Sequence, residues 1–205
     1  MRIDHIVFAV RDIDAAAREF GDRYGLEAQA RAELEGSGTA NRIVPVGNDQ
    51  FIELLGISDA KSRHPIVRFL SAQLVQGDRL LQLAIDPGDI DSVSARLGEP
   101  VPEVVRTNEG RRTRFRLTGV AGGFGPQLLP FFVVCAEGRE WRMGYAPARH
   151  RVRAEGIRWV ELGSDEALVR AQLAGAELPL RFAPGRPGVS ALALALDGEE
   201  VVLRS

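Results

Sequence analysis

The sequence predicts an α+β fold made of repeated units, each with one strand, one helix and three further strands. Short runs rich in β-branched residues alternate with capped, amphipathic helical segments along the 205 residues. In addition, the tripeptide Asp-Ile-Asp opens a helical segment at residues 12–14 and again at 89–91, an offset of 77 positions. One repeated architecture explains this echo better than unrelated domains do.

The first unit is expected at residues 1–57. Residues 3–10 (IDHIVFAV) have the composition of a strand, and the next segment has helical periodicity from Asp12, a good N-cap, to Tyr24. Gly25 then suits a left-handed helix end. Three strands separated by turn signals should complete the unit, at Glu27–Leu34, Ala40–Val46 and Gln50–Ile57.

A connecting helix that begins at Pro65 should lead to a second unit at residues 79–136. This unit has a helix at Asp89–Leu97, a Gly-rich loop at 119–126 that opens no evident helix, and strands that start at Leu80, Val101, Arg111 and Leu128. A shorter third unit at 156–205 repeats the order, with its helix at Glu166–Leu173. We therefore expect a single domain over residues 1–205.

Composition and charge exclude several classes of protein. The net charge of −2 provides no field that would favour nucleic acid or an anionic membrane surface. The longest apolar run, Leu128–Ala136, is far shorter than the roughly 18 residues that a membrane-spanning helix needs. A single cysteine, Cys135, rules out an internal disulfide framework, and the first residues lack the layout of a secretory signal. A cytoplasmic location is therefore the expectation.

The order of elements resembles the glyoxalase-like domain family of the vicinal oxygen chelate superfamily. The resemblance is closest in DHIVFAV at the N-terminus and in GTANRIVPVGNDQFIELLG at the end of the first unit. In that superfamily, paired modules curl into a curved mixed sheet that forms a cup, with helices on its outer face. The resemblance implies such a cup here, with a small-molecule ligand inside it.

Family metal ligands typically come from the first and last strands of each module, which here implies His5 and Glu53. The 77-residue offset carries His5 onto Gln82. Such a set would suit Zn²⁺, Ni²⁺, Mn²⁺ or Fe²⁺. The fourth position falls in LLPFFVVCA, where Cys135 alone could bind a metal, and this departure weakens the case for a metal.

Each of these residues also has a purely structural interpretation. His5 could be a hydrogen-bonded residue on a half-buried strand, and Glu53 could face solvent. Asn41 could bind the ligand through its amide, or it could close a turn after the Gly-Ser-Gly stretch. Arg114 lies with two other arginines, Arg112 and Arg116, on one strand face. Inside the cup they would bind a carboxylate or phosphate, whereas outside it they would be solvated surface.

Two functions follow from these candidates. The first is a metal-dependent lyase, isomerase or dioxygenase, in which Glu53 serves as the carboxylate that moves a proton on a small oxygenated metabolite. The second is a non-catalytic binding protein of the drug-sequestering type, which needs no metal. A homodimer is one expectation, since cups of this superfamily are frequently completed across a symmetric partner. The alternative is that the third unit covers the cup within the chain.

Overall fold

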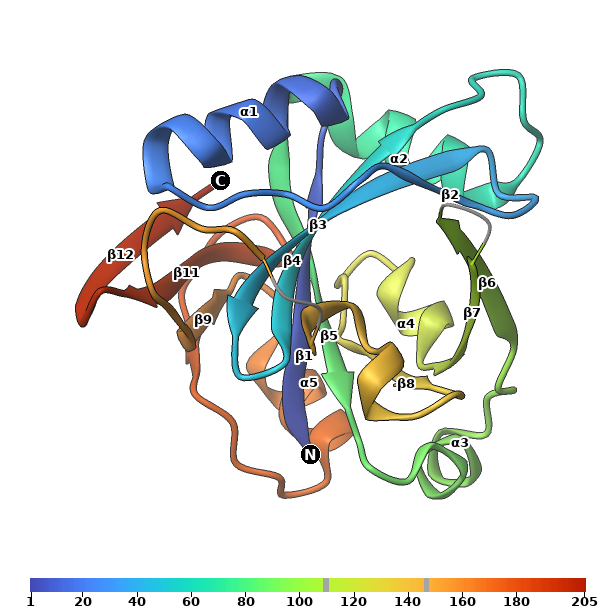
Figure 1. Cartoon of the computed structure of the whole chain (residues 1–205). Coiled ribbons are helices and arrows are strands. Elements are labelled where there is room, and N and C mark those ends of the chain that lie inside the picture. The colour runs from blue at the N-terminus through green and yellow to red at the C-terminus, as the bar shows by residue number, and fades with distance from the viewer. Residues whose placement is uncertain (109–110, 146–147) are drawn as a thin grey trace.

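Two linked sheets form the body of the protein. The structure is a computed structural model that describes residues 1–108, 111–145 and 148–205, so the turn expected at 109–110 lies outside the described residues. Eight of the described strands close into a barrel, and four more form a separate sheet beside it (Figure 1). The fold is therefore α+β with a curved mixed sheet, as the sequence predicts, and the curvature is strong enough to close the sheet.

The first two units have the expected order of elements. The first comprises β1 (Arg2–Ala9), α1 (Ile13–Tyr24), β2 (Ala32–Leu34), β3 (Thr39–Gly47) and β4 (Gln50–Ile57). After α2 (Pro65–Gln73) and the 3₁₀ turn η1 (Leu74–Gln76), the second comprises β5 (Arg79–Asp86), α3 (Ile90–Leu97), β6 (Glu103–Asn108), β7 (Arg111–Thr118), the short α4 (Val120–Gly123) and β8 (Phe131–Cys135).

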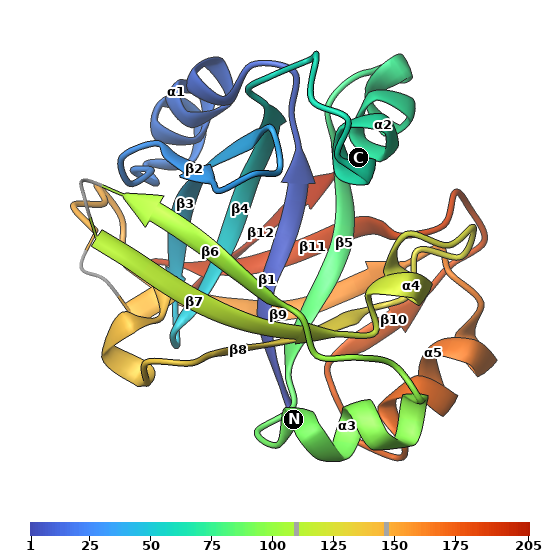
Figure 2. The same cartoon turned by 90° about the vertical axis from the view of Figure 1, so that its right-hand side faces the viewer.

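These two modules also pair their strands in the same way. In each, the first strand lies parallel to the last, and the last, third and second strands follow in antiparallel order. Two antiparallel seams join the modules, one between β1 and β5 and the other between β2 and β6. Figure 2 shows β1 and β5 side by side along the molecule. The barrel is thus an internal repeat closed upon itself.

The third unit repeats the order of elements but not their pairing. It follows the turns η2 (Arg139–Trp141) and η3 (Met143–Tyr145) and comprises β9 (Ala154–Leu162), α5 (Glu166–Leu173), β10 (Leu180–Phe182), β11 (Val189–Leu196) and β12 (Glu199–Arg204). Here β10 pairs with β9 in parallel, and β11 lies between β9 and β12. Because α5 returns the chain directly beside β9, the last strand cannot take that position.

Local signals set the helix ends as predicted. The Asp12 carboxylate accepts hydrogen bonds from the Asp14 and Ala15 amides, both at 2.9 Å, and Gly25 ends α1 with a φ of 69°. Asp89 and Gly98 play the same parts for α3. The repeated Asp-Ile-Asp therefore marks the same structural event in both modules.

Some of the predicted elements were wrong in detail. The strand expected to start at Leu128 begins at Phe131. The second strand begins at Ala32 rather than Glu27, because the preceding backbone finds partners outside β2: the Glu27 amide donates to His150, and the Gln29 amide donates to the Ile43 carbonyl. The Gly-rich stretch holds a single helical turn, α4, instead of a plain loop. Neither of the last two features has a period that sequence reasoning could detect.

Strands β1, β4 and β5 are buried on both faces. Their outer side chains, such as Ile6, Leu54 and Leu83, join the main core beneath α1 and the third-unit sheet. Their inner side chains point into the barrel, where Val7 and Leu55 pack against residues of α2 and η1. Among the described residues no helix has the length and apolar character needed to cross a membrane.

We predict that Gly56→Ala lowers the free energy of unfolding by about 1–3 kcal/mol. Gly56 lies where β4 meets α1, and an added Cβ would lie 2.7 Å from Ile13 Cγ1 and 3.0 Å from the Val10 carbonyl oxygen. Gly21 is the matched control, because a Cβ there meets nothing within 4 Å and Gly21→Ala should stabilise α1 by about 0.5–1 kcal/mol. Urea denaturation measures both changes, and equal stability of the two variants would contradict the proposed contact.

Candidate functional site

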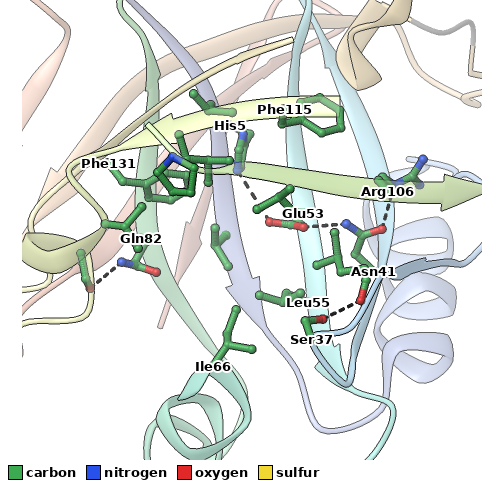
Figure 3. A pocket seen from close by; sticks show the side chains of 18 of the residues that line it. His5, Ser37, Asn41, Glu53, Leu55, Ile66, Gln82, Arg106, Phe115 and Phe131 are labelled. Carbon is green, nitrogen blue, oxygen red and sulfur yellow. Dashed lines mark hydrogen bonds and ion pairs between the residues drawn. The ribbon is translucent and has the colours of Figure 1, made fainter. Parts of the chain in front are cut away.

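A cavity of about 550 Å³ lies inside the barrel. Apolar side chains from both modules form most of its wall: Val7, Leu55, Phe115, Leu117, Phe131 and Val133. Polar side chains gather around the same space: Asp4, His5, Asn41, Glu53, Gln82 and Arg106. Figure 3 shows all of these except Asp4, which it does not label, approaching from different strands. An apolar cavity with a few convergent polar groups is the usual form of a small-molecule site.

A bulge in β1 places Asp4 and His5 on the same side of the strand. The pairing of β1 with β5 is irregular between Ile3 and His5, so the usual alternation of side chains is broken there. His5 Nδ1 lies 2.7 Å from Asp4 Oδ1, and its other nitrogen, Nε2, lies 3.6 Å from Glu53 Oε2. The ring also stacks on Phe51 with centroids 4.4 Å apart, so its orientation is fixed from three directions.

Asn41 connects Glu53 to Arg106. Its amide nitrogen donates to Glu53 Oε1 at 2.6 Å, and its amide oxygen accepts from Arg106 Nε at 3.0 Å. These two partners settle the orientation of the amide, since a carboxylate cannot donate and a guanidinium cannot accept. Ala32 lies directly opposite Asn41 on β2, and its short side chain leaves room for Arg106 to reach across from β6.

Arg106 is a buried cation without full hydrogen bonding. Its side chain lines the cavity with 6% of the residue exposed, and within the described residues its Nη2 has no hydrogen-bond partner. Burial lowers the pKa of the guanidinium, and the negative charge of Glu53 offsets part of that effect. No sequence pattern singles out Arg106, because a lone arginine on a strand carries no positional signal.

Gln82 lies across β1 from Glu53. Val7 pairs with Gln82 on one side and with Glu53 on the other, so both side chains flank the same inward position. The Gln82 amide nitrogen donates to the Gly123 carbonyl at 2.6 Å. Figure 3 shows the amide oxygen turned away from that bond, toward the side where Glu53 lies.

Phe131 takes the place of a second carboxylate. Ala84 is the counterpart of Val7 at the 77-residue offset, and it pairs with Phe131 as Val7 pairs with Glu53. The position of the missing fourth ligand is therefore an aromatic ring, which meets the His5 ring edge-on at 5.8 Å between centroids. Cys135 lies four residues further along β8 and is not among the residues that line the cavity.

The residues present fit a divalent ion only weakly. Two bonds of roughly 2.1 Å could bridge the 3.6 Å between His5 Nε2 and Glu53 Oε2, and both side chains have the second partner that metal ligands usually have. Gln82 would add one neutral oxygen. In the part of the chain that the structure describes, no group of three or more His, Cys, Asp or Glu side chains is arranged to hold a metal.

Arg114, a predicted substrate-binding residue, lies outside the cavity. Its guanidinium binds Glu137 at 2.9 Å, while Arg112 binds Glu35 and Arg116 binds Asp91. The three arginines do share one strand face, but it is the solvent-exposed face of β7. The inner face of β7 carries Phe115 and Leu117 instead. In the structure these arginines therefore lie on the surface of β7, each paired with a carboxylate.

Two other histidines have structural roles. His64 caps α2 by accepting from the Ile66 amide at 3.3 Å, and it also lines the rim of the cavity. His150 accepts from the Glu27 amide, and its Nε2 lies 2.7 Å from the Pro45 carbonyl oxygen, so it ties the segment after η3 to the first module.

The fold and the cavity together define a class of protein: a closed pair of βαβββ modules with a polar cluster inside. The family profile of the glyoxalase-like domain matches residues 3–178. The chain belongs to the glyoxalase-like domain family. The predicted resemblance is thereby confirmed.

One solved structure shows the same fold along nearly its whole length, and others are similar to part of this chain. A hypothetical protein from Staphylococcus aureus is similar over 98% of both chains, with 15% identity and a TM-score of 0.64. A methylmalonyl-CoA epimerase in complex with methylmalonyl-CoA has 22% identity and a TM-score of 0.48, over 66% of this chain and 94% of the epimerase. The epimerase from Mycobacterium tuberculosis has 25% identity and a TM-score of 0.45, over 65% and 86%. No curated protein matches the sequence significantly.

We predict that Cys135 reacts slowly with iodoacetamide in the folded protein. Burial raises the pKa of its thiol, so less of the reactive thiolate is present at pH 8 than in the unfolded chain. The rate in native buffer should be lower than the rate in concentrated urea, as measured by mass spectrometry. Equal rates in the two conditions would show that Cys135 is an accessible thiol after all.

Proposed function

We propose that the protein is an enzyme of the lyase or isomerase type that moves a proton on a small oxygenated metabolite held inside the barrel. The observation that carries this proposal is the approach of His5 Nε2 to Glu53 Oε2, 3.6 Å apart, in a largely apolar cavity. Away from water, such a pair can accept and return a proton with little competition from solvent.

The roles of the residues follow from their partners. Glu53 is the proposed proton acceptor, because Oε1 is held by Asn41 while Oε2 faces His5 and the cavity. Asp4 orients His5, and a cation or a ligand atom near Nε2 and Oε2 would contact both groups. Val7, Leu55 and Phe131 exclude water from the ligand.

A divalent ion, whether Zn²⁺, Ni²⁺, Mn²⁺ or Fe²⁺, would be held by His5, Glu53 and Gln82. Such an ion supplies Lewis-acid polarisation of a carbonyl or hydroxyl oxygen. With one carboxylate as the only anionic ligand, we expect binding to be weak and the purified protein to carry little metal unless it is supplied.

The second candidate is a non-catalytic binding protein for organic molecules. It is favoured by Phe131 at the counterpart of Glu53, which gives the second module an aromatic wall and no reactive group. The expected homodimer stays a prediction. Because one chain closes the barrel, a partner would have no part in completing the cavity.

Proton transfer can be tested by exchange into D₂O. Small metabolites with a hydrogen next to a carbonyl are incubated with the protein, and ¹H NMR follows the loss of that hydrogen. We expect exchange with some of these compounds, reduced about 10²- to 10⁴-fold in Glu53→Gln. Arg114→Gln on the outer face is the control and should exchange like the wild type. Binding of these compounds without any exchange would support the second candidate instead.

Metal binding is tested separately by titrating the protein with each of the four ions and measuring the heat of binding by calorimetry. His5→Ala and Glu53→Gln should each weaken binding by at least tenfold, since each removes one of three ligands. Tight binding of one ion per chain that survives both substitutions would place the metal elsewhere in the protein.

A further inference from the structure

One feature of the cavity has no part in proton transfer: the buried, incompletely bonded guanidinium of Arg106. The Arg106 side chain lies in the cavity wall, and Asn41 is its one hydrogen-bond partner among the described residues. A buried arginine is normally paired with an anion, because desolvating its charge is costly. Glu53, the carboxylate whose negative charge acts on Arg106, is kept from direct contact by the Asn41 amide between them.

We propose that Arg106 binds the carboxylate group of the ligand, so that the substrates of this cavity are small carboxylic acids. This deepens the proposed function and rests on it for the position of the reacting carbon. A guanidinium presents parallel N–H donors in a fork that matches the two oxygens of a carboxylate. Arg106 lines the cavity, and its Nη2, buried without a partner among the described residues, shows that the cation is incompletely compensated.

The spacing of the cluster fits a short acid. Only the Asn41 amide and its two hydrogen bonds, of 3.0 and 2.6 Å, separate the guanidinium from the Glu53 carboxylate. A carboxylate on Arg106 therefore brings the adjacent carbons within reach of Glu53 and His5. The apolar part of the cavity wall, which includes Phe115 and Phe131, would then contact the remainder of the ligand.

Asn41 has a different role in this arrangement from the one that the sequence suggested. It is fully buried, with its amide oxygen on Arg106 and its amide nitrogen on Glu53. It is thus a positioning residue, which holds a cation and an anion apart and at a fixed separation. In this arrangement Arg106, which lies on β6 beyond β2, makes the direct contact with the ligand.

The test measures binding to the full-length protein by calorimetry, with lactate as the probe and lactamide as its uncharged counterpart. Ionic strength is matched with sodium chloride. We expect lactate to bind with a Kd on the order of 1–10 mM and lactamide at least tenfold more weakly. Arg106→Gln should lower the lactate affinity at least tenfold, and Arg114→Gln, an arginine of the outer face, should leave it unchanged.

Several outcomes would overturn the proposal. These are lactamide binding as tightly as lactate, full lactate affinity in Arg106→Gln, or no lactate binding by the wild type up to about 50 mM. Inorganic phosphate that binds as tightly as lactate would show an unselective anion site and would also overturn the assignment of a carboxylate.

Two further measurements keep the test independent of folding and of catalysis. Without ligand, Arg106→Gln should melt at the wild-type temperature or above, because it removes a buried charge that lacks a partner. If it does not fold, Arg106→Lys takes its place and should retain only part of the lactate affinity. Glu53→Gln should lose proton exchange yet keep lactate binding, so failure of the carboxylate site and failure of the catalytic proposal give different results.

Discussion

The antiparallel pairing of β1 with β5 is the constraint on which the rest of the structure depends. It joins the first strands of the two modules, and the parallel pairing within each module then places the last strand beside the first. His5, Gln82 and Glu53 meet around the cavity because these three strands are neighbours. A slip of one residue at this seam would turn Gln82 into the core and Leu83 into the cavity.

The electrostatics of the barrel interior depend on Asn41. Glu53 and Arg106 are both buried, and a direct salt bridge between them would neutralise each charge and leave nothing for a ligand to satisfy. The interposed amide satisfies one acceptor of Glu53 and one donor of Arg106, while it keeps Oε2 and Nη2 out of the pairing. The low dielectric of the cavity then strengthens whatever interaction these remaining atoms make.

Much of the fold could be predicted because its determinants are local. Asp12 and Asp89 mark the starts of their helices because their own side chains cap the first turn. The strand pattern of residues 3–10 can likewise be recognised without knowledge of the neighbouring strands. The inward direction of His5 and Glu53 was predicted from the family resemblance, because the pairing of strands cannot be derived from one sequence alone. Sequence alone cannot distinguish Arg106 from Arg114, since each is an arginine on a strand. Only the pairing of the strands into a closed sheet shows that Arg106 lines the cavity and Arg114 does not.

The third unit shows the same limit at the level of topology. Its elements could be read from periodicity, yet its strands pair in another order, because pairing depends on which edge the returning chain meets. This sheet packs against the outer faces of β3 and β5. Its apolar residues therefore stabilise the strands that carry the polar cluster without entering the cavity.

The two modules have the same topology but supply different kinds of side chain to the cavity. The first supplies Asp4, His5, Asn41 and Glu53, whereas the second supplies Gln82, Arg106 and the aromatic wall with Phe131 in place of a carboxylate. A barrel with two equivalent modules would offer a ligand two equivalent orientations. Here the acidic and imidazole groups come from the first module, whereas Arg106 and Phe131 come from the second, so the two ends of a ligand meet different side chains and one orientation of the ligand is favoured.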